Sequence, residues 1–313
     1  MMHNPVYNSS MWVVEKYMRG NPTMDLNQLR IDITHQYAQE HAALGLKGAR
    51  AKLVEAQEWQ LAPVLQKGGA LVFPHAGVAE CAKQIAACIN ACIDSGADTV
   101  LVLSVLHAFS DEMEQARRRV AAGGDPSTDR IWGIQGPGLT RGDEWAYDHA
   151  LFTWRYLWEV AADYYGKKMP RVIERYPWLA GGQPTLLPGY DEVVDIAKNA
   201  VVVSTADMFH HGIGYGTPID QSYFPAQGGL ELASRTIMAG AQMLAEADYA
   251  GYNQHCVAAK SDHRDAGQVM RAVLGPMRPE IIDIIASDAA ALYKAPDPTW
   301  VAGTLVAWHK IDA

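Results

Sequence analysis

The chain has 313 residues, of which 49% are hydrophobic and 19% are charged, so a large core can form and intrinsic disorder is excluded. The 26 Lys and Arg residues against 35 Asp and Glu residues give a formal net charge of −9, which excludes a general nucleic-acid binder. No apolar run reaches the roughly 18 residues of a membrane span. Residues 1–22 lack the apolar core of a secretory signal, and four cysteines do not make a disulfide scaffold, so we expect a cytoplasmic protein with reduced thiols.

The first part of the chain has helical periodicity and no chemical motif. Two helices are predicted, one from residue 24 to about residue 44 and one over residues 47–66, ended by Lys67-Gly68-Gly69. We therefore expect residues 1–66 to be an N-terminal helical extension and residues 67–313 to be an α/β domain.

Two short apolar runs end in histidine-bearing turns. The first, at residues 70–73, leads into His75 and then into a helix predicted over 78–95. The second, at residues 98–104, leads into His107. A right-handed βαβ unit would make these strands parallel and adjacent. Both histidines would then lie beyond the carboxyl ends of neighbouring strands, which is where open α/β sheets bind ligands.

A third buried strand, predicted at 200–204, leads into Asp207, His210 and His211. The other predicted elements are a polar loop at 110–145, a helical stretch at 145–165, a loop at 176–190, helices at 190–199, 228–248, 264–274 and 281–292, and a strand at 300–308. A single histidine after a strand is most often structural. Three such strand ends favour a histidine-lined site, because imidazole is the commonest metal ligand and acid–base group near neutral pH.

Phe73-Pro74-His75-Ala76-Gly77 resembles the Pro-His-Ala-Gly motif of the Memo family, whose members share the fold of class III extradiol ring-cleaving dioxygenases. Three segments resembling family motifs follow in the family's order: the strand end at 103–107, the acidic segment at 143–149 and the strand end at 203–210. The resemblance covers about residues 69–308. It implies an α/β domain with a central mixed β-sheet flanked by helices.

The resemblance also implies a metal site. His75 and His107 correspond to the metal-binding histidines of the family. Asp207 and His210 correspond to a pair behind the metal, and His210 to the acid–base histidine of the ring-cleaving relatives.

The third ligand is where this sequence departs from the family, which has a Glu or a Cys there. Aligning the helix starts places Lys260 or Ser261 opposite that Cys, and neither is a good ligand. Asp262 would complete a two-histidine, one-carboxylate set that suits Fe(II), whereas His263 would make a three-histidine site that also suits zinc or copper. Cys256 is a further candidate, and Asp262 is alternatively a helix N-cap.

The leading hypothesis is a mononuclear non-haem Fe(II) dioxygenase that uses O₂ on a small catechol- or aminophenol-like substrate. In it, His210 is the acid–base residue and Asp207 orients it. One alternative is a non-catalytic Memo-like protein that binds a metal or a peptide, and a weaker one is a zinc-dependent hydrolase. Glu144 and Asp148 are either site carboxylates or solvated, and assembly into a homo-oligomer stays open.

Overall fold

The computed structural model of the chain describes residues 25–139 and 142–311, so the signal-sequence prediction for residues 1–22 falls outside the described residues. The strands are β1 (Ala70–Phe73), β2 (Thr99–Leu103), β3 (Gly133–Gln135), β4 (Arg171–Trp178), β5 (Val201–Thr205), β6 (His210–Gly212), β7 (Met277–Asp288) and β8 (Thr299–Lys310). The α-helices are α2 (Leu26–Glu55), α3 (Ala62–Gln66), α4 (Val78–Asp94), α5 (Asp111–Ala121), α6 (Phe152–Tyr165), α7 (Tyr190–Ala197), α8 (Gly229–Ala245), α9 (Tyr249–Ala259), α10 (Arg264–Leu274) and α11 (Ala290–Tyr293).

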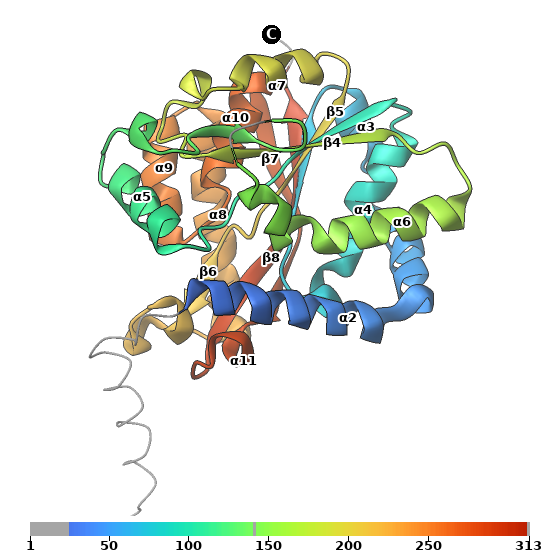
Figure 1. Cartoon of the computed structure of the whole chain (residues 1–313). Helices are drawn as coiled ribbons and strands as arrows, with labels where there is room; N and C mark the ends of the chain where they lie inside the picture. Colours follow the sequence, from blue (N-terminus) through green and yellow to red (C-terminus); the bar gives the residue numbers. More distant parts are fainter. Residues whose placement is uncertain (1–24, 140–141, 312–313) are drawn as a thin grey trace, which may run out of the picture.

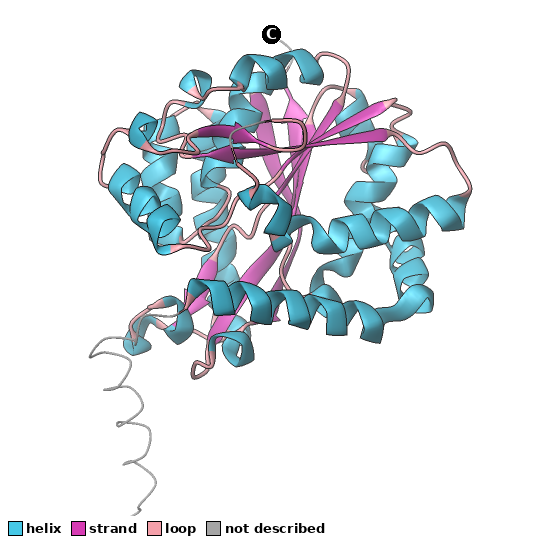
Figure 2. Cartoon of the chain, in the orientation of Figure 1, coloured by secondary structure: helices cyan, strands magenta, loops and turns pink. Residues whose placement is uncertain are grey.

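The strands form one mixed sheet with helices on both faces, as Figures 1 and 2 show, which confirms the α/β class. Its order is β3-β4-β2-β5-β1-β8-β6, and β7 also pairs with β8. The central strands β4, β2, β5 and β1 are parallel, and β8 runs antiparallel to β1. Among the described residues, no helix combines the length and the apolar composition that a membrane crossing requires.

Both faces of the central strands are covered, which explains why their sequences are continuously apolar. All four residues of β1 are buried. Leu71 and Phe73 belong to the core beneath α2, α4 and α6, whereas Ala70 and Val72 belong to the core beneath α7, α8, α9 and α10. The sheet is therefore the middle layer of three.

The strands that carry the two histidine turns are parallel, as predicted, but they are not adjacent. β5 lies between them and pairs in parallel with both β1 and β2. The chain returns to the centre of the sheet after it has built β4 at the far side, and a local βαβ pattern cannot reveal that later insertion. The consequence is functional, because the turn after β5 lies between the turns after β1 and β2.

The helix predicted at residues 281–292 is wrong over most of its length. β7 occupies Met277–Asp288 and pairs antiparallel with β8 over 11 registered positions, with an irregularity between Ile281 and Asp283. Ile281, Ile284 and Ile285 have helical spacing, but β-branched residues also suit a strand, and the long partner strand decides the outcome.

Two predicted loops contain regular structure. The segment 110–145 holds α5 and β3, and Ser110 caps α5 by accepting a hydrogen bond from the backbone N–H of Met113 at 3.2 Å. The segment 176–190 begins inside β4, whose charged first half and Pro177 obscure its strand character. Helix α9 is also absent from the predicted elements.

Helix α2 covers the first predicted N-terminal helix and the start of the second, whose remainder is a 3₁₀ turn and the short helix α3. Gly45 (φ 59°, ψ 174°) breaks the helical geometry of α2, close to the predicted break between residues 44 and 47. Figure 1 shows α2 crossing beneath α6, and both helices contact α4. The side chains of Ile33, Tyr37 and Leu53 join the same buried core as α4. The extension is thus packed into the body of the protein.

This packing gives a testable stability difference on one helix. Leu53 is fully buried and Leu46 is 60% exposed. Leu53→Ala should lower the free energy of unfolding by about 2–5 kcal/mol, because it leaves a cavity between α2 and α4, and Leu46→Ala should change it by less than about 0.5 kcal/mol. Urea unfolding of the full chain measures both. Equal values for the two variants would show that α2 contributes little to the cooperative fold.

Candidate metal centre

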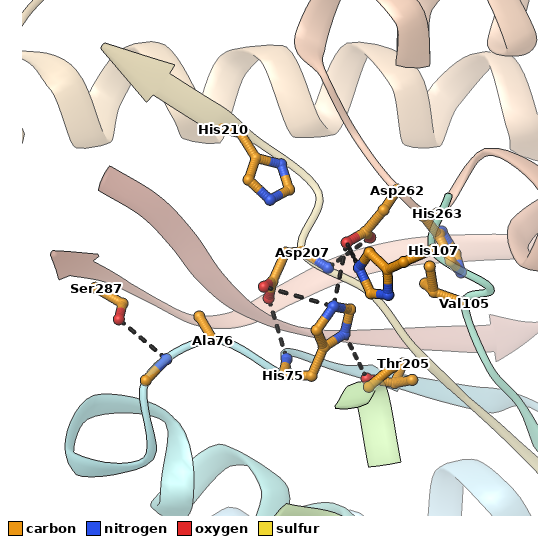
Figure 3. Close-up of polar contacts among 12 residues, drawn as sticks. His75, Ala76, Val105, His107, Thr205, Asp207, His210, Asp262, His263 and Ser287 are labelled. Carbon is orange, nitrogen blue, oxygen red and sulfur yellow. Dashed lines mark hydrogen bonds and ion pairs between the residues drawn. The ribbon is translucent and has the colours of Figure 1, made fainter. Parts of the chain in front are cut away.

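Four connections meet beyond the carboxyl ends of the parallel strands. His75 follows β1, His107 follows β2 and Asp207 follows β5, while Asp262 lies in the turn between α9 and α10. Because β5 separates β1 from β2, Asp207 sits between the two histidine turns. Figure 3 shows the four side chains pointing toward one another.

One carboxylate oxygen is shared by the two imidazoles. Asp262 Oδ2 lies 3.2 Å from His75 Nε2 and 3.6 Å from His107 Nε2. The two rings are nearly perpendicular, with centroids 5.2 Å apart. Asp207 Oδ2 is 3.7 Å from His75 Nε2. The structure thus brings together His75, His107, Asp207 and Asp262.

Two of the converging atoms are buried and lack a hydrogen-bond partner. His75 Nε2 and Asp262 Oδ2 are in this condition: they lie 3.2 Å apart as an ion pair, but neither forms a hydrogen bond of normal geometry. Buried polar atoms in native proteins are normally paired, so such an arrangement calls for an explanation. A divalent cation held by both atoms and by His107 Nε2 would satisfy them.

The orientation of each imidazole is fixed by a hydrogen-bond contact at its Nδ1, the ring nitrogen on the side away from Asp262. His107 Nδ1 lies 3.0 Å from Oδ1 of the fully buried Asp148. Because a carboxylate at neutral pH only accepts, Nδ1 donates, and Nε2 is the nitrogen left for a metal. Asp148 also accepts the backbone N–H of His107 at 2.6 Å. His75 Nδ1 lies 3.1 Å from the hydroxyl of Thr205. Asp148 is therefore a site carboxylate, whereas Glu144 is ion-paired with Arg130.

The electrostatics of the group favour a bound cation. Burial opposes the charged form of His107, but the Asp148 and Asp262 carboxylates outweigh it and raise its pKa to about 10. The same competition raises the pKa of His75, where Asp207 and Asp262 supply the negative charge. Without a metal these rings hold protons against the carboxylates. A metal ion would replace those protons, as ligand imidazoles must be neutral.

His263 does not join the group, contrary to the expectation that kept it as a ligand. It is 1% exposed, and its ring nitrogens lie 3.2 Å from Ser204 Oγ and 3.0 Å from the Tyr252 hydroxyl. Adjacent residues in this turn point to opposite sides, so Asp262 faces the histidines and His263 faces the core. Burial lowers the pKa of His263 to about 4, which keeps it neutral.

The helix-cap alternative for Asp262 is also wrong. Helix α10 begins at Arg264, and no side chain caps it. Asp262 Oδ1 instead accepts the backbone N–H of Asp207 at 2.8 Å. This bond leaves Oδ2 directed toward the two histidines. Cys256 is buried and lines the same cavity, but among the described residues it belongs to neither group of converging ligand atoms.

The predicted pairing of Asp207 with His210 is corrected by the hydrogen bonds. His210 Nδ1 lies 2.6 Å from the carbonyl oxygen of Lys260. Because a carbonyl only accepts, Nδ1 carries the proton and the neutral ring presents Nε2 as a base. Asp207 Oδ1 accepts the backbone N–H of His75 at 3.0 Å and supports the metal cluster instead. Burial lowers the pKa of His210 and keeps the ring neutral near pH 7.

Two contributors to the site were not predicted as site residues: Tyr37, and His149 at the end of the acidic segment 143–149. His149 stacks on His107 with ring centroids 4.3 Å apart, and its Nδ1 is buried without a partner. His75, His107 and His149 form one group whose ligand atoms lie within 4.8 Å of one another, and His75, Asp207 and Asp262 form another. Tyr37, from the N-terminal extension, donates its hydroxyl to the carbonyl oxygen of His75. A helix pattern alone cannot show that one of its residues covers an active cleft.

The cluster lies at the wall of a cavity of about 430 Å³. This volume suits a small organic molecule. His75, His107, Asp207 and His210 line it together with aromatic residues, among them Phe109 and Tyr215. Figure 3 shows the side chain of His210 near Asp207. His210 comes from β6, whereas His75 and His107 follow β1 and β2.

The chain was compared with models of known protein families, and none matched. A search of curated proteins found no significant match.

His211, next to the acid–base candidate, has a structural role that predicts a pH effect. Its Nε2 accepts the backbone N–H of Tyr223 at 2.9 Å, and burial lowers its pKa. As the pH falls below about 6.5, His211 becomes protonated in the unfolded chain but stays neutral in the folded chain, where its pKa is lower. The free energy of unfolding should therefore fall, by up to about 1.4 kcal/mol per pH unit from this residue.

Chemical denaturation between about pH 7.5 and pH 5 measures this slope. His211→Gln should have a shallower slope than the parent, and His35→Gln, a change at an exposed position on α2, serves as the control. Identical slopes for the parent and His211→Gln would contradict the assignment.

Proposed function

We propose that this chain is a mononuclear non-haem Fe(II) oxygenase that uses O₂ on a small catechol- or aminophenol-like substrate. One observation carries the proposal: unpartnered atoms of His75 and Asp262 converge with His107 Nε2 at the wall of a cavity. Two histidines and one carboxylate on one face, with positions left open, are the ligand set of non-haem Fe(II) oxygenases.

The residues fit such an ion. His75, His107 and Asp262 would hold it, while Thr205 and Asp148 keep the imidazoles in place. Bound there, Fe(II) would supply open positions for substrate and O₂ and a route for electrons between them.

Proton transfer is assigned to His210. Its Nδ1–H is engaged by the Lys260 carbonyl, so Nε2 is free to take a proton from a substrate hydroxyl or amine and to return one later. The lowered pKa keeps His210 unprotonated before the substrate arrives. Tyr215 packs edge-on against the ring at 4.8 Å and limits its rotation.

The resemblance of the His75, His107 and Asp207–His210 segments to the Memo family supports the same reading. The mixed α/β sheet with ligands beyond the carboxyl ends of parallel strands is compatible with the class III extradiol fold, which forms part of the proposal. The carboxylate third ligand, where Memo proteins have a Cys, favours an enzyme over a non-catalytic Memo-like binder, because it leaves a hard, open ligand set beside an oriented base.

A second candidate follows from His149. His75, His107 and His149 could hold zinc as a three-histidine site, which suits a hydrolase that activates water. Asp262 is favoured over His149 as the third ligand, because its Oδ2 lies 3.2 Å from His75 Nε2 and 3.6 Å from His107 Nε2 and is buried without a hydrogen bond.

Metal content distinguishes the two ligand sets. Asp262→Asn keeps the acceptor for the Asp207 N–H but removes the charge, so it should weaken Fe(II) binding by more than the 10- to 100-fold that loss of a supporting partner costs. His149→Gln and the control Asp288→Asn should bind Fe(II) as the parent does. Metal titration under anaerobic conditions measures all three. Loss of binding in His149→Gln with retention in Asp262→Asn would instead indicate the three-histidine site.

His210→Gln should retain Fe(II) and lower turnover by about 10²–10⁴, the usual contribution of a positioned acid–base group. Oxygen uptake with catechols and 2-aminophenols measures turnover, and iron analysis of the same samples measures retention. Loss of iron would make His210 a ligand. Absence of oxygen uptake by the iron-loaded parent with every such compound would count against the oxygenase.

A further inference from the structure

A buried arginine without a partner lines the same cavity, apart from the metal cluster. Arg264 is 6% exposed, and its Nη2 is buried without a hydrogen bond. Its guanidinium forms no hydrogen bond or ion pair with any residue in the described ranges 25–139 and 142–311. An isolated buried charge is costly, so a native protein that keeps one normally uses it for a ligand.

A second cation approaches the same wall. Arg117, on α5, also lines the cavity, and its Nε is buried without a partner. Its Nη2 donates to the carbonyl oxygen of Leu106 at 3.0 Å, and its guanidinium lies 5.1 Å from the ring centre of Trp178. Burial and the nearby Arg264 lower the pKa of Arg117, which shows that the two positive charges act on each other.

The neighbouring carboxylates are already engaged elsewhere. Asp265 accepts the backbone N–H of Ala180 at 2.8 Å, and Glu114 pairs with Arg118 at 2.7 Å. Arg264 is also the first residue of α10, so the positive end of the helix dipole adds to its charge. Asp265, Asp262 and Glu114 oppose the effect of Arg264 on Arg117, but none of these carboxylates forms an ion pair with either arginine in the described part of the chain.

We propose that Arg264 and Arg117 form an anion subsite that binds the carboxylate of an aromatic acid. A planar carboxylate matches the planar fork of a guanidinium, and about 430 Å³ with aromatic walls suits one substituted ring. The anion subsite does not depend on the proposed function. Only the statement that the same molecule chelates a metal held by His75 and His107 rests on it.

Metal-free protein tests the subsite without relying on iron. Isothermal titration with benzoate and with its neutral analogue benzamide should give at least about 10-fold tighter binding of benzoate. Arg264→Gln and Arg117→Gln should each weaken benzoate binding by about 10- to 100-fold and leave benzamide unchanged, because each removes charge-assisted hydrogen bonds. Arg119→Gln, an exposed position on α5 outside the cavity, should behave as the parent.

The melting temperature of Arg264→Gln distinguishes a ligand-binding arginine from one that stabilises the fold. Removing an unpaired buried charge should leave the melting temperature of Arg264→Gln unchanged or raise it. A large fall in melting temperature would show a structural role and overturn the assignment of Arg264.

Equal binding of benzoate and benzamide by the parent, or tighter binding of inorganic phosphate than of benzoate, would overturn the proposed carboxylate class even if a variant failed to fold. Intact benzoate preference in a protein that binds no iron would leave the subsite standing and count against the oxygenase.

Discussion

The structure depends on one electrostatic constraint: the Asp262 carboxylate is buried between two histidines with one oxygen unpaired. Its Oδ1 is fixed by the backbone of Asp207, so Oδ2 must face His75 and His107. Removing a carboxylate from water is costly unless an opposite charge compensates it. Protons on the imidazoles compensate it in the metal-free chain, and a cation would do so when bound. Folding of the loops beyond β1, β2 and β5 therefore brings together groups that could hold a cation.

The residues that follow parallel strands were predictable, because the carboxyl ends of such strands meet at one sheet edge whatever the strand order. His75, His107 and Asp207 are brought together for that reason, even though β5 separates β1 from β2. Local apolar runs and helical periodicity likewise predict β1, β2, β5, α4 and α10. These elements are determined by residues close in sequence, which is the information that a single chain contains.

The remainder depends on contacts between distant segments. β7 is a strand because β8 is available to pair with it, although its isoleucines have helical spacing. Asp262 and His263 are equally capable ligands by composition, and the hydrogen bond from the Asp207 N–H selects which of them faces the metal group. Arg264 enters the site with no motif around it, and the acidic segment 143–149 did not mark His149 as part of the site. Only the packed structure shows that both are buried with unpaired atoms.

The cavity is lined by groups of both charges, and under the proposals above this would orient a substrate. The His75, Asp207 and Asp262 group could hold a cation, and the Nη2 of Arg264, buried without a hydrogen bond, could bind an anion. A ring that carries a chelating pair and a carboxylate can satisfy both ends in one orientation, since reversal would place its carboxylate against Asp207 and Asp262. His210 then meets the chelating end, because its Nδ1 is held by Lys260, two residues before Asp262. Binding energy at the guanidinium would, under both proposals, position the proton that His210 is proposed to remove.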